Sequence, residues 1–276
     1  LKDSLVGRDY VSWSPDSKRV AYFSINVSTE KDASRDSVIT LMDIEKDIHS
    51  NASFLGKNPD WSPDGSHIAF ISIGLDGGCL ALYEVNEQQI NLIETSYEGT
   101  KYRPHFSPDG ELIAYFNSHN QNSDLWVYDI VTKDHIQLTF DGGEKRNMDW
   151  SPDSEVITYN QMNESNNWEI WSVPSYGGKS QLITSNQHHD VWPLWNEEKR
   201  DFILYGSLRD NGWELRKIDL EANDSHVLLS FPDLGVLQRS QWSPRLILRR
   251  NMSHIYYEFG AWFYRAIYVS EIGKKN

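Results

Sequence analysis

The sequence predicts an all-β protein, and more specifically a six-bladed β-propeller of four-stranded antiparallel blades. Two observations support this prediction: an aromatic residue recurs at nearly constant spacing, and a short turn motif follows it in most copies. The recurring aromatic residues are Trp13, Trp61, Phe106, Trp150, Trp195 and Trp242. Their intervals are 48, 45, 44, 45 and 47 residues. A period in the forties with several short strands per repeat is typical of propeller blades.

The clearest copy of the turn motif spans residues 59–72, Pro-Asp-Trp-Ser-Pro-Asp-Gly-Ser-His-Ile-Ala-Phe-Ile-Ser. A strand that ends at Trp61 meets the turn, and a second strand follows. Asp-Gly between two such runs indicates a hairpin, because the turn requires a positive φ that Gly65 adopts at low cost. An Asp recurs at this turn as Asp16, Asp64, Asp109 and Asp153. We interpret this Asp as a turn former and not as a catalytic acid.

Strand-like runs follow each recurring aromatic residue. In the first five blades they are 19–25, 37–44 and 49–55; 67–73, 79–85 and 90–95; 112–117, 125–130 and 135–140; 156–160, 168–173 and 180–184; and 202–207, 214–220 and 226–231. The last blade has 246–250, 254–264 and 266–272, after which the chain ends without a fourth strand. We therefore expect the N-terminal strand, residues 1–6, to close the last blade and remove its open edge. A single propeller domain then occupies residues 1–276.

Composition narrows the classes of function. The net charge of −14 disfavours a nucleic-acid or anionic-membrane surface. No segment approaches the roughly 20 consecutive apolar residues of a membrane span, so we expect no membrane insertion. Cys79 is the single cysteine, which excludes an internal disulfide. We expect a monomer.

The Trp-Ser-Pro-Asp-Gly-type repeats resemble those of TolB-like β-propellers. They are also similar to repeats in the propeller domains of prolyl-oligopeptidase-family peptidases and in oligogalacturonate lyases. The resemblance covers essentially the whole chain and implies a propeller fold, a TolB-like binding role and a periplasmic or secreted location. Because the shared residues build blades, the repeats themselves specify no chemistry.

Polar and aromatic residues gather just before each recurring aromatic residue, in the loop and strand that enter each blade. In a propeller these segments open on one face around the central channel, and converging polar groups there form the default binding-site hypothesis. The candidate ligand-binding residues are Tyr10, Asp60, Arg103, His105, Arg146, Asp149, His188, Asp190, Trp192, Arg239 and Gln241. The alternative is that several of them tie blades together, for example through an ion pair of Asp60 with Arg103.

The run His188-His189-Asp190 raises the hypothesis of a divalent metal cofactor. Alternate residues of an extended segment point the same way, so His188 and Asp190 could share an ion, with His105 as a third ligand. Oligogalacturonate lyases use a His-rich metal site on such a propeller, but their spaced His-x-His ligand run is absent from this sequence. The alternative is a polar loop with titrating histidines.

Three functions remain open from the sequence. The first is a TolB-like binding propeller that recognises a protein segment or small ligand at the mouth of its channel. The second is a lyase or hydrolase acting on an acidic oligosaccharide, metal-assisted or not. Its catalytic candidates are His105, His188 and Tyr10, and its carboxylate-holding residues would be Arg103, Arg146 and Arg239. The third is a sensor or scaffold domain of a longer chain. Whether the protein is an enzyme stays open at this point.

Overall fold

The computed structural model describes residues 5–26, 36–44, 46, 48–73, 78–94, 97–120, 122–232, 245–248, 254–261 and 264–271. All regular structure in these residues is β-strand, which confirms the predicted all-β class. Helices long and apolar enough to cross a membrane are not found in the described ranges. The chain divides into two compact units, Leu1–Gly142 and Gly143–Asn276, and each is described by itself.

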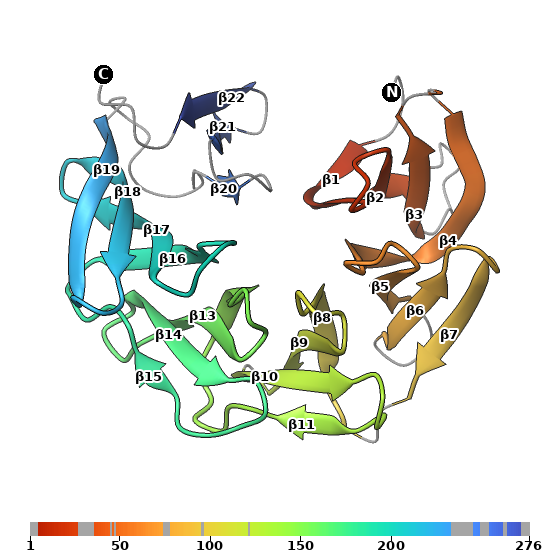
Figure 1. Ribbon diagram of the computed structural model, residues 1–276, viewed down its shortest axis with the longest axis horizontal. Helices are drawn as coiled ribbons and strands as arrows, with labels where there is room; N and C mark the ends of the chain where they lie inside the picture. The colour runs from red at the N-terminus through yellow and green to blue at the C-terminus, as the bar shows by residue number, and fades with distance from the viewer. Residues whose placement is uncertain are drawn as a thin grey trace. The chain divides into compact units, whose positions relative to one another are not determined.

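The first unit contains two antiparallel sheets. Strands β1 to β7 form one sheet in sequential order, and β8 to β11 form a four-stranded sheet. The strands are β1 (Leu5–Trp13), β2 (Arg19–Asn26), β3 (Asp36–Asp43), β4 (Ile48–Trp61), β5 (His67–Ser72), β6 (Leu80–Glu84), β7 (Gln89–Ile93), β8 (Thr100–Phe106), β9 (Leu112–His119), β10 (Asn122–Asp129) and β11 (His135–Gln137). The first part of β4 pairs with β3 and its last part with β5 (Figure 1). One long strand thus leads from one blade into the next.

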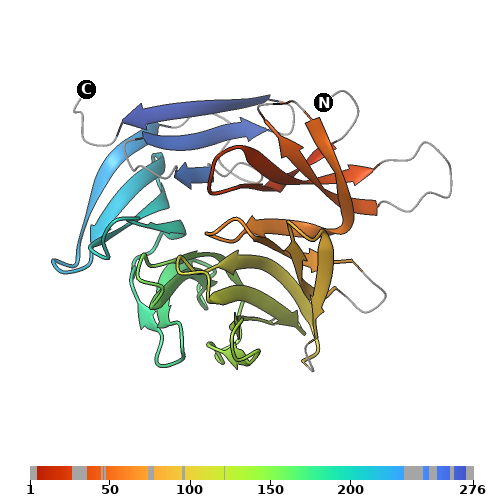
Figure 2. The same cartoon turned by 45° about the vertical axis from the view of Figure 1, so that its right-hand side comes forward.

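The second unit repeats the same antiparallel pattern. Strands β12 to β15 and β16 to β19 form two four-stranded sheets, and β20 to β22 form a three-stranded sheet. The strands are β12 (Lys145–Trp150), β13 (Val156–Met162), β14 (Trp168–Pro174), β15 (Gln181–Leu182), β16 (His189–Trp195), β17 (Phe202–Arg209), β18 (Gly212–Asp219), β19 (Asp224–Pro232), β20 (Arg245–Leu248), β21 (His254–Ala261) and β22 (Tyr264–Glu271). The long paired strands β18 and β19 are light blue in Figure 2.

The N-terminal strand differs from the expectation. Leu5 and Val6 pair with Ile25 and Ser24 of β2, so they extend the innermost strand of the first blade. The register shifts between Val6 and Val11. Residues 7–10 therefore form an irregularity within one strand and not a turn between two strands. Residues 1–4 lie outside the described ranges, and closure of the last blade, the number of blades and the single domain over 1–276 stay predictions.

The recurring turn is built from one Ser and one Asp. In the second blade Ser62 Oγ donates a hydrogen bond to Asp64 Oδ1 at 2.6 Å, and the backbone N–H of His67 donates to Ser62 Oγ at 2.9 Å. The hydrogen bond from Ser62 is the main cause that lowers the pKa of Asp64 to about 2. The same Ser–Asp contact occurs in Ser14–Asp16, Ser107–Asp109 and Ser151–Asp153. This geometry agrees with the turn-former interpretation.

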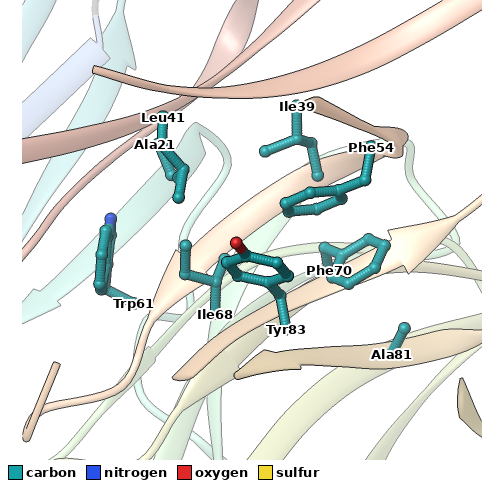
Figure 3. Close-up of a cluster of buried hydrophobic side chains, with 9 residues drawn as sticks. All are labelled: Ala21, Ile39, Leu41, Phe54, Trp61, Ile68, Phe70, Ala81 and Tyr83. Atoms are coloured by element: carbon teal, nitrogen blue, oxygen red, sulfur yellow. The ribbon is translucent and has the colours of Figure 1, made fainter. Parts of the chain in front are cut away.

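Four of the recurring aromatic residues, Trp61, Phe106, Trp150 and Trp195, are buried, whereas Trp13 is 52% exposed. Trp61 is buried in a cluster with residues of the two blades that β4 joins (Figure 3). Phe54 packs at the centre of this cluster, with its ring centroid 4.6 Å from Phe70 and 4.8 Å from Tyr83. Phe106 and Trp195 lie in equivalent buried clusters. The residues just before each aromatic residue are thereby held in fixed positions at one end of the blade.

Candidate functional site

At three positions, the residue that precedes a recurring aromatic residue accepts a hydrogen bond from the backbone of the next blade. Asp60 Oδ2 accepts a hydrogen bond from the backbone N–H of Phe106 at 2.9 Å. The equivalent acceptors are Ser12 for the N–H of Trp61 at 3.0 Å and Asp149 for the N–H of Trp195 at 2.6 Å. We call this contact the blade latch. Asp60 and Asp149, two of the candidate ligand-binding residues, thus hold neighbouring blades together.

His105 extends the latch in the first unit. Its Nδ1 lies 3.0 Å from Asp60 Oδ2. Asp60 thus pairs with His105, whereas the example given from the sequence was an ion pair of Asp60 with Arg103. Arg103 lies on the same strand, β8, and its backbone N–H donates to Asn58 Oδ1 at 3.4 Å. The structure therefore brings Asp60, Arg103 and His105 together along β4 and β8, as contacts between blades.

The third residue before four of the recurring aromatic residues, Trp61, Phe106, Trp150 and Trp195, has left-handed backbone. The φ angles are 59° for Asn58, 52° for Arg103, 48° for Asn147 and 53° for Trp192. Each lies where the register of the innermost strand shifts. Such a conformation is uncommon for Arg and Trp. Since it recurs at one position of four blades, it is a feature of the fold, a bulge that redirects the side chains around it.

In the second unit, aromatic and cationic side chains gather at the end of the blades where the innermost strands begin. The Arg146 guanidinium lies over the ring of Trp168, 5.2 Å from its centroid, and also pairs with Glu144. The backbone N–H of Trp168 donates to His189 Nδ1 at 3.3 Å. This contact joins the first residue of β14 to the first residue of β16, so that two neighbouring blades share one surface.

Trp192 and Trp213 continue this surface. Their ring centroids are 5.1 Å apart, and both side chains are partly exposed. Trp192 packs closely on Gly206 of β17, where an added Cβ would lie 2.9 Å from Trp192 Cε3. Glycine at position 206 therefore permits the approach of the indole ring. We call Arg146, Trp168, Trp192 and Trp213 together the Trp–Arg face.

A network of polar and charged side chains surrounds the buried carboxylate of Asp190 in the same unit. Asp190 is 1% exposed, and its carboxylate accepts hydrogen bonds from Ser207 Oγ and, at 2.6 Å, from Asn186 Nδ2. Arg209 Nη2 lies 4.0 Å from Asp190 Oδ1, and Arg209 Nε lies 3.8 Å from Glu214 Oε2. A buried carboxylate of this kind is stabilised by its partners and orders the strands that supply them.

The same network bears on the metal hypothesis. Both carboxylate oxygens of Asp190 already accept hydrogen bonds, and the backbone N–H of His188 donates to Asn186 Oδ1 at 2.8 Å. Across the described ranges, no group of three or more His, Cys, Asp or Glu side chains is placed to hold a metal ion. The assignment of His188 and Asp190 as metal ligands stays a prediction.

Three predicted site residues lie partly or wholly outside the described structure, and two residues of the Trp–Arg face were not predicted from the sequence. Tyr10 lies in β1, but its side chain is outside what the structure describes, as are Arg239 and Gln241 entirely. Trp168 and Trp213 were not predicted, because neither precedes a recurring aromatic residue. They stand at the start of the third strand of their blades. Antiparallel pairing brings that position to the same sheet end as the start of the innermost strand, and this signal was available in the sequence.

The antiparallel blades, their latches and the repeated turn define a β-propeller of the TolB repeat class. The chain belongs to the TolB beta propeller domain family, whose model matches residues 11–246. It is 30% identical over 143 residues to dipeptidyl-peptidase 5 of Porphyromonas gingivalis, covering 46% of this chain and 21% of that protein. It is 27% identical over 172 residues to the Tol-Pal system protein TolB of Francisella tularensis subsp. mediasiatica, covering 60% of this chain and 39% of that one.

Comparison with solved structures agrees with the fold. A prolyl endopeptidase structure matches with a TM-score of 0.71 and 15% identity, covering 98% of this chain and 41% of that chain. Similarity at this identity concerns the fold alone. The chain spans between about a fifth and two fifths of the length of these three proteins. The resemblance to TolB-like and prolyl-peptidase propellers is thereby confirmed.

Proposed function

We propose that this protein is a TolB-like binding propeller that recognises a protein or peptide segment through the Trp–Arg face. The observation that carries the proposal is the arrangement of three partly exposed tryptophans and one arginine on two neighbouring blades of the second unit. Tryptophan and arginine are enriched among the residues that contribute most to protein–protein binding. We also propose that this binding site lies at the mouth of a central channel.

The rigidity of the face supports a binding role. Trp192 is held by its contact with Gly206, and Trp168 by the hydrogen bond of its backbone N–H to His189. Side chains already fixed in position lose little conformational entropy on binding, which favours affinity. The Arg146 guanidinium would supply a charged hydrogen-bond donor beside the aromatic rings.

Two further properties belong to the proposal. A periplasmic or secreted location is supported by the similarity to a Tol-Pal system protein. A monomer is the simplest state, because one chain supplies every residue of the Trp–Arg face. The alternative function, a lyase or hydrolase acting on an acidic oligosaccharide, stays a prediction.

Selection from a displayed peptide library tests the proposal. Peptides enriched on the wild-type protein are measured by calorimetry against Trp213→Ala and against Tyr176→Ala. Tyr176 is a matched control, since it is an exposed aromatic residue of the same unit. It follows the end of β14 opposite to Trp168. Trp213→Ala should weaken binding by about tenfold or more, and Tyr176→Ala should leave it unchanged.

Two results would contradict the proposal. One is the failure of any peptide to enrich on the folded wild-type protein. The other is equal affinity of the selected peptides for the wild type and Trp213→Ala, with circular dichroism showing that the variant remains folded.

A further inference from the structure

A second site lies in the first unit, at one end of the sheet β8–β11. A pocket of about 460 Å³ opens there, lined by residues of the β9–β10 hairpin and of the loop that leads into β8. Asn117 of β9 pairs in register with Asp124 of β10, and Trp126 of β10 pairs with Gln137 of β11. Paired residues project from the same side of a sheet. These four side chains therefore form one continuous wall of the pocket.

The opposing loop is fixed by hydrogen bonds to its backbone. Lys101 Nζ donates to the carbonyl oxygens of Tyr97 at 2.7 Å and Gly99 at 3.3 Å. Asn117 Nδ2 donates to the carbonyl oxygen of Glu98 at 3.0 Å. The Tyr97 ring packs on Trp126 with 4.3 Å between ring centroids. The pocket is therefore formed before any ligand arrives, which lowers the entropic cost of binding.

The free polar atoms of the wall formed by Asn117, Asp124 and Gln137 are mainly acceptors. Gln137 Nε2 donates within the protein, to Asp124 Oδ2 at 3.2 Å and to the carbonyl oxygen of Thr139 at 2.8 Å. Asn117 Nδ2 is used by the loop, whereas its Oδ1 is buried without a hydrogen-bond partner in a residue that is 8% exposed. An amide oxygen in that state adds an uncompensated partial negative charge to the wall.

The charged residues that line the pocket also favour a cationic ligand. The lining residues include two carboxylates, Glu98 and Asp124, and none of them is lysine or arginine. The side chain of Lys101 is directed to the backbone carbonyls of the loop. Tyr97 is 44% exposed, so part of its ring is accessible from solvent. An aromatic ring beside carboxylates and amide oxygens is suited to a cation.

We propose that this pocket binds the cationic end of an arginine or lysine side chain presented by a peptide. Guanidinium and ammonium groups carry only hydrogen-bond donors, which match the acceptors at the wall. Glu98 supplies the opposite charge, and Tyr97 supplies the aromatic contact. A polyhydroxylated neutral ligand would need donors as well as acceptors from the wall, where the amide N–H groups of Gln137 are already engaged. This inference is independent of the Trp–Arg face.

Blocked tripeptides with a single central side chain test the pocket directly. Glycyl-arginyl-glycine amide and its lysine analogue are titrated into the isotopically labelled full chain and followed by NMR. The citrulline analogue, which has the shape of arginine without its charge, is the matched ligand control. The arginine or lysine peptide should shift signals of residues 97–99 and 122–126 saturably, about tenfold more tightly than citrulline. Affinity should fall as the ionic strength rises.

A pair of variants locates the interaction. Glu98→Gln removes one charge at the pocket, and Glu111→Gln removes one from the turn just before the opposite end of β9. Both glutamates are exposed, so both variants should fold. Glu98→Gln should weaken binding of the arginine peptide about tenfold, and Glu111→Gln should leave it unchanged. Equal binding of citrulline, equal affinity of Glu98→Gln and wild type, or preferential binding of methyl N-acetylglucosaminide would each overturn the proposal.

Discussion

The carboxylate of Asp149 accepts a hydrogen bond from the backbone N–H of Trp195, 46 positions further along the chain, at 2.6 Å. Asp60 makes the same contact with Phe106 at 2.9 Å. In each case a side chain at the end of one blade satisfies a backbone donor in the innermost strand of the next. The blade latch therefore couples the position of a polar residue to the packing of the recurring aromatic residue beside it.

Removing the latch should destabilise the fold. Asp149→Ala leaves the N–H of Trp195 without its acceptor, and we expect a loss of about 1–3 kcal/mol in the free energy of unfolding. Urea denaturation followed by circular dichroism measures this loss. Asp210→Ala, at an exposed hairpin turn of the second unit, is the control and should change stability by less than about 0.5 kcal/mol. Equal stability of the two variants would show that the latch contributes little.

The contact between Trp192 and Gly206 predicts a non-additive pair of substitutions. Gly206→Ala places a Cβ 2.9 Å from Trp192 Cε3, so the ring or the strand must move. We expect destabilisation of about 1–3 kcal/mol. In a Trp192→Ala background the same substitution should cost much less, because the colliding ring is absent. A double-mutant cycle by urea denaturation measures the difference, and an identical cost in both backgrounds would rule out the collision.

The lowered pKa of Asp64 predicts a dependence of stability on acid. Its pKa is about 2 in the folded protein against an ordinary value of 3.8. The stabilisation from ionised Asp64 is therefore fully present above about pH 4 and is lost as the pH falls toward 2. Asp64→Asn should flatten the fall in stability between pH 4 and 2, as should Ser62→Ala, which removes the main hydrogen bond to Asp64. If NMR titration gives a pKa near 3.8 for Asp64 in the folded wild type, this explanation fails.

Most of the fold could be predicted because its signals are local. The runs 112–117, 125–130 and 202–207 all overlap strands, since a short apolar run bounded by turn residues is a signal that spans only a few residues. The N-terminal strand was predicted less well. Leu5 and Val6 pair with β2 across a register shift, and no short-range pattern in residues 7–10 distinguishes such an irregularity from a turn.

The site was harder to predict because its contacts join distant residues. The sequence marked Asp60 and Asp149 as polar groups at a concave opening, but their partners are backbone N–H groups about one repeat away, which have no sequence signature. The sequence also predicted Trp192 as a ligand-binding residue, and this assignment stays a prediction. Trp213, whose ring centroid lies 5.1 Å from that of Trp192, was not among the predicted residues, although its place at the start of a third strand could have indicated it.

The most direct test of the Trp–Arg face is a site-specific cross-link. Trp213 is replaced by p-benzoylphenylalanine, Tyr176 is replaced in the same way in a second sample, and each is irradiated with a library-selected peptide bound. Mass spectrometry then measures the yield of the adduct at each position. We predict a high yield at position 213 and background yield at position 176. A peptide that cross-links equally at both positions, or only at 176, would contradict recognition through the Trp–Arg face.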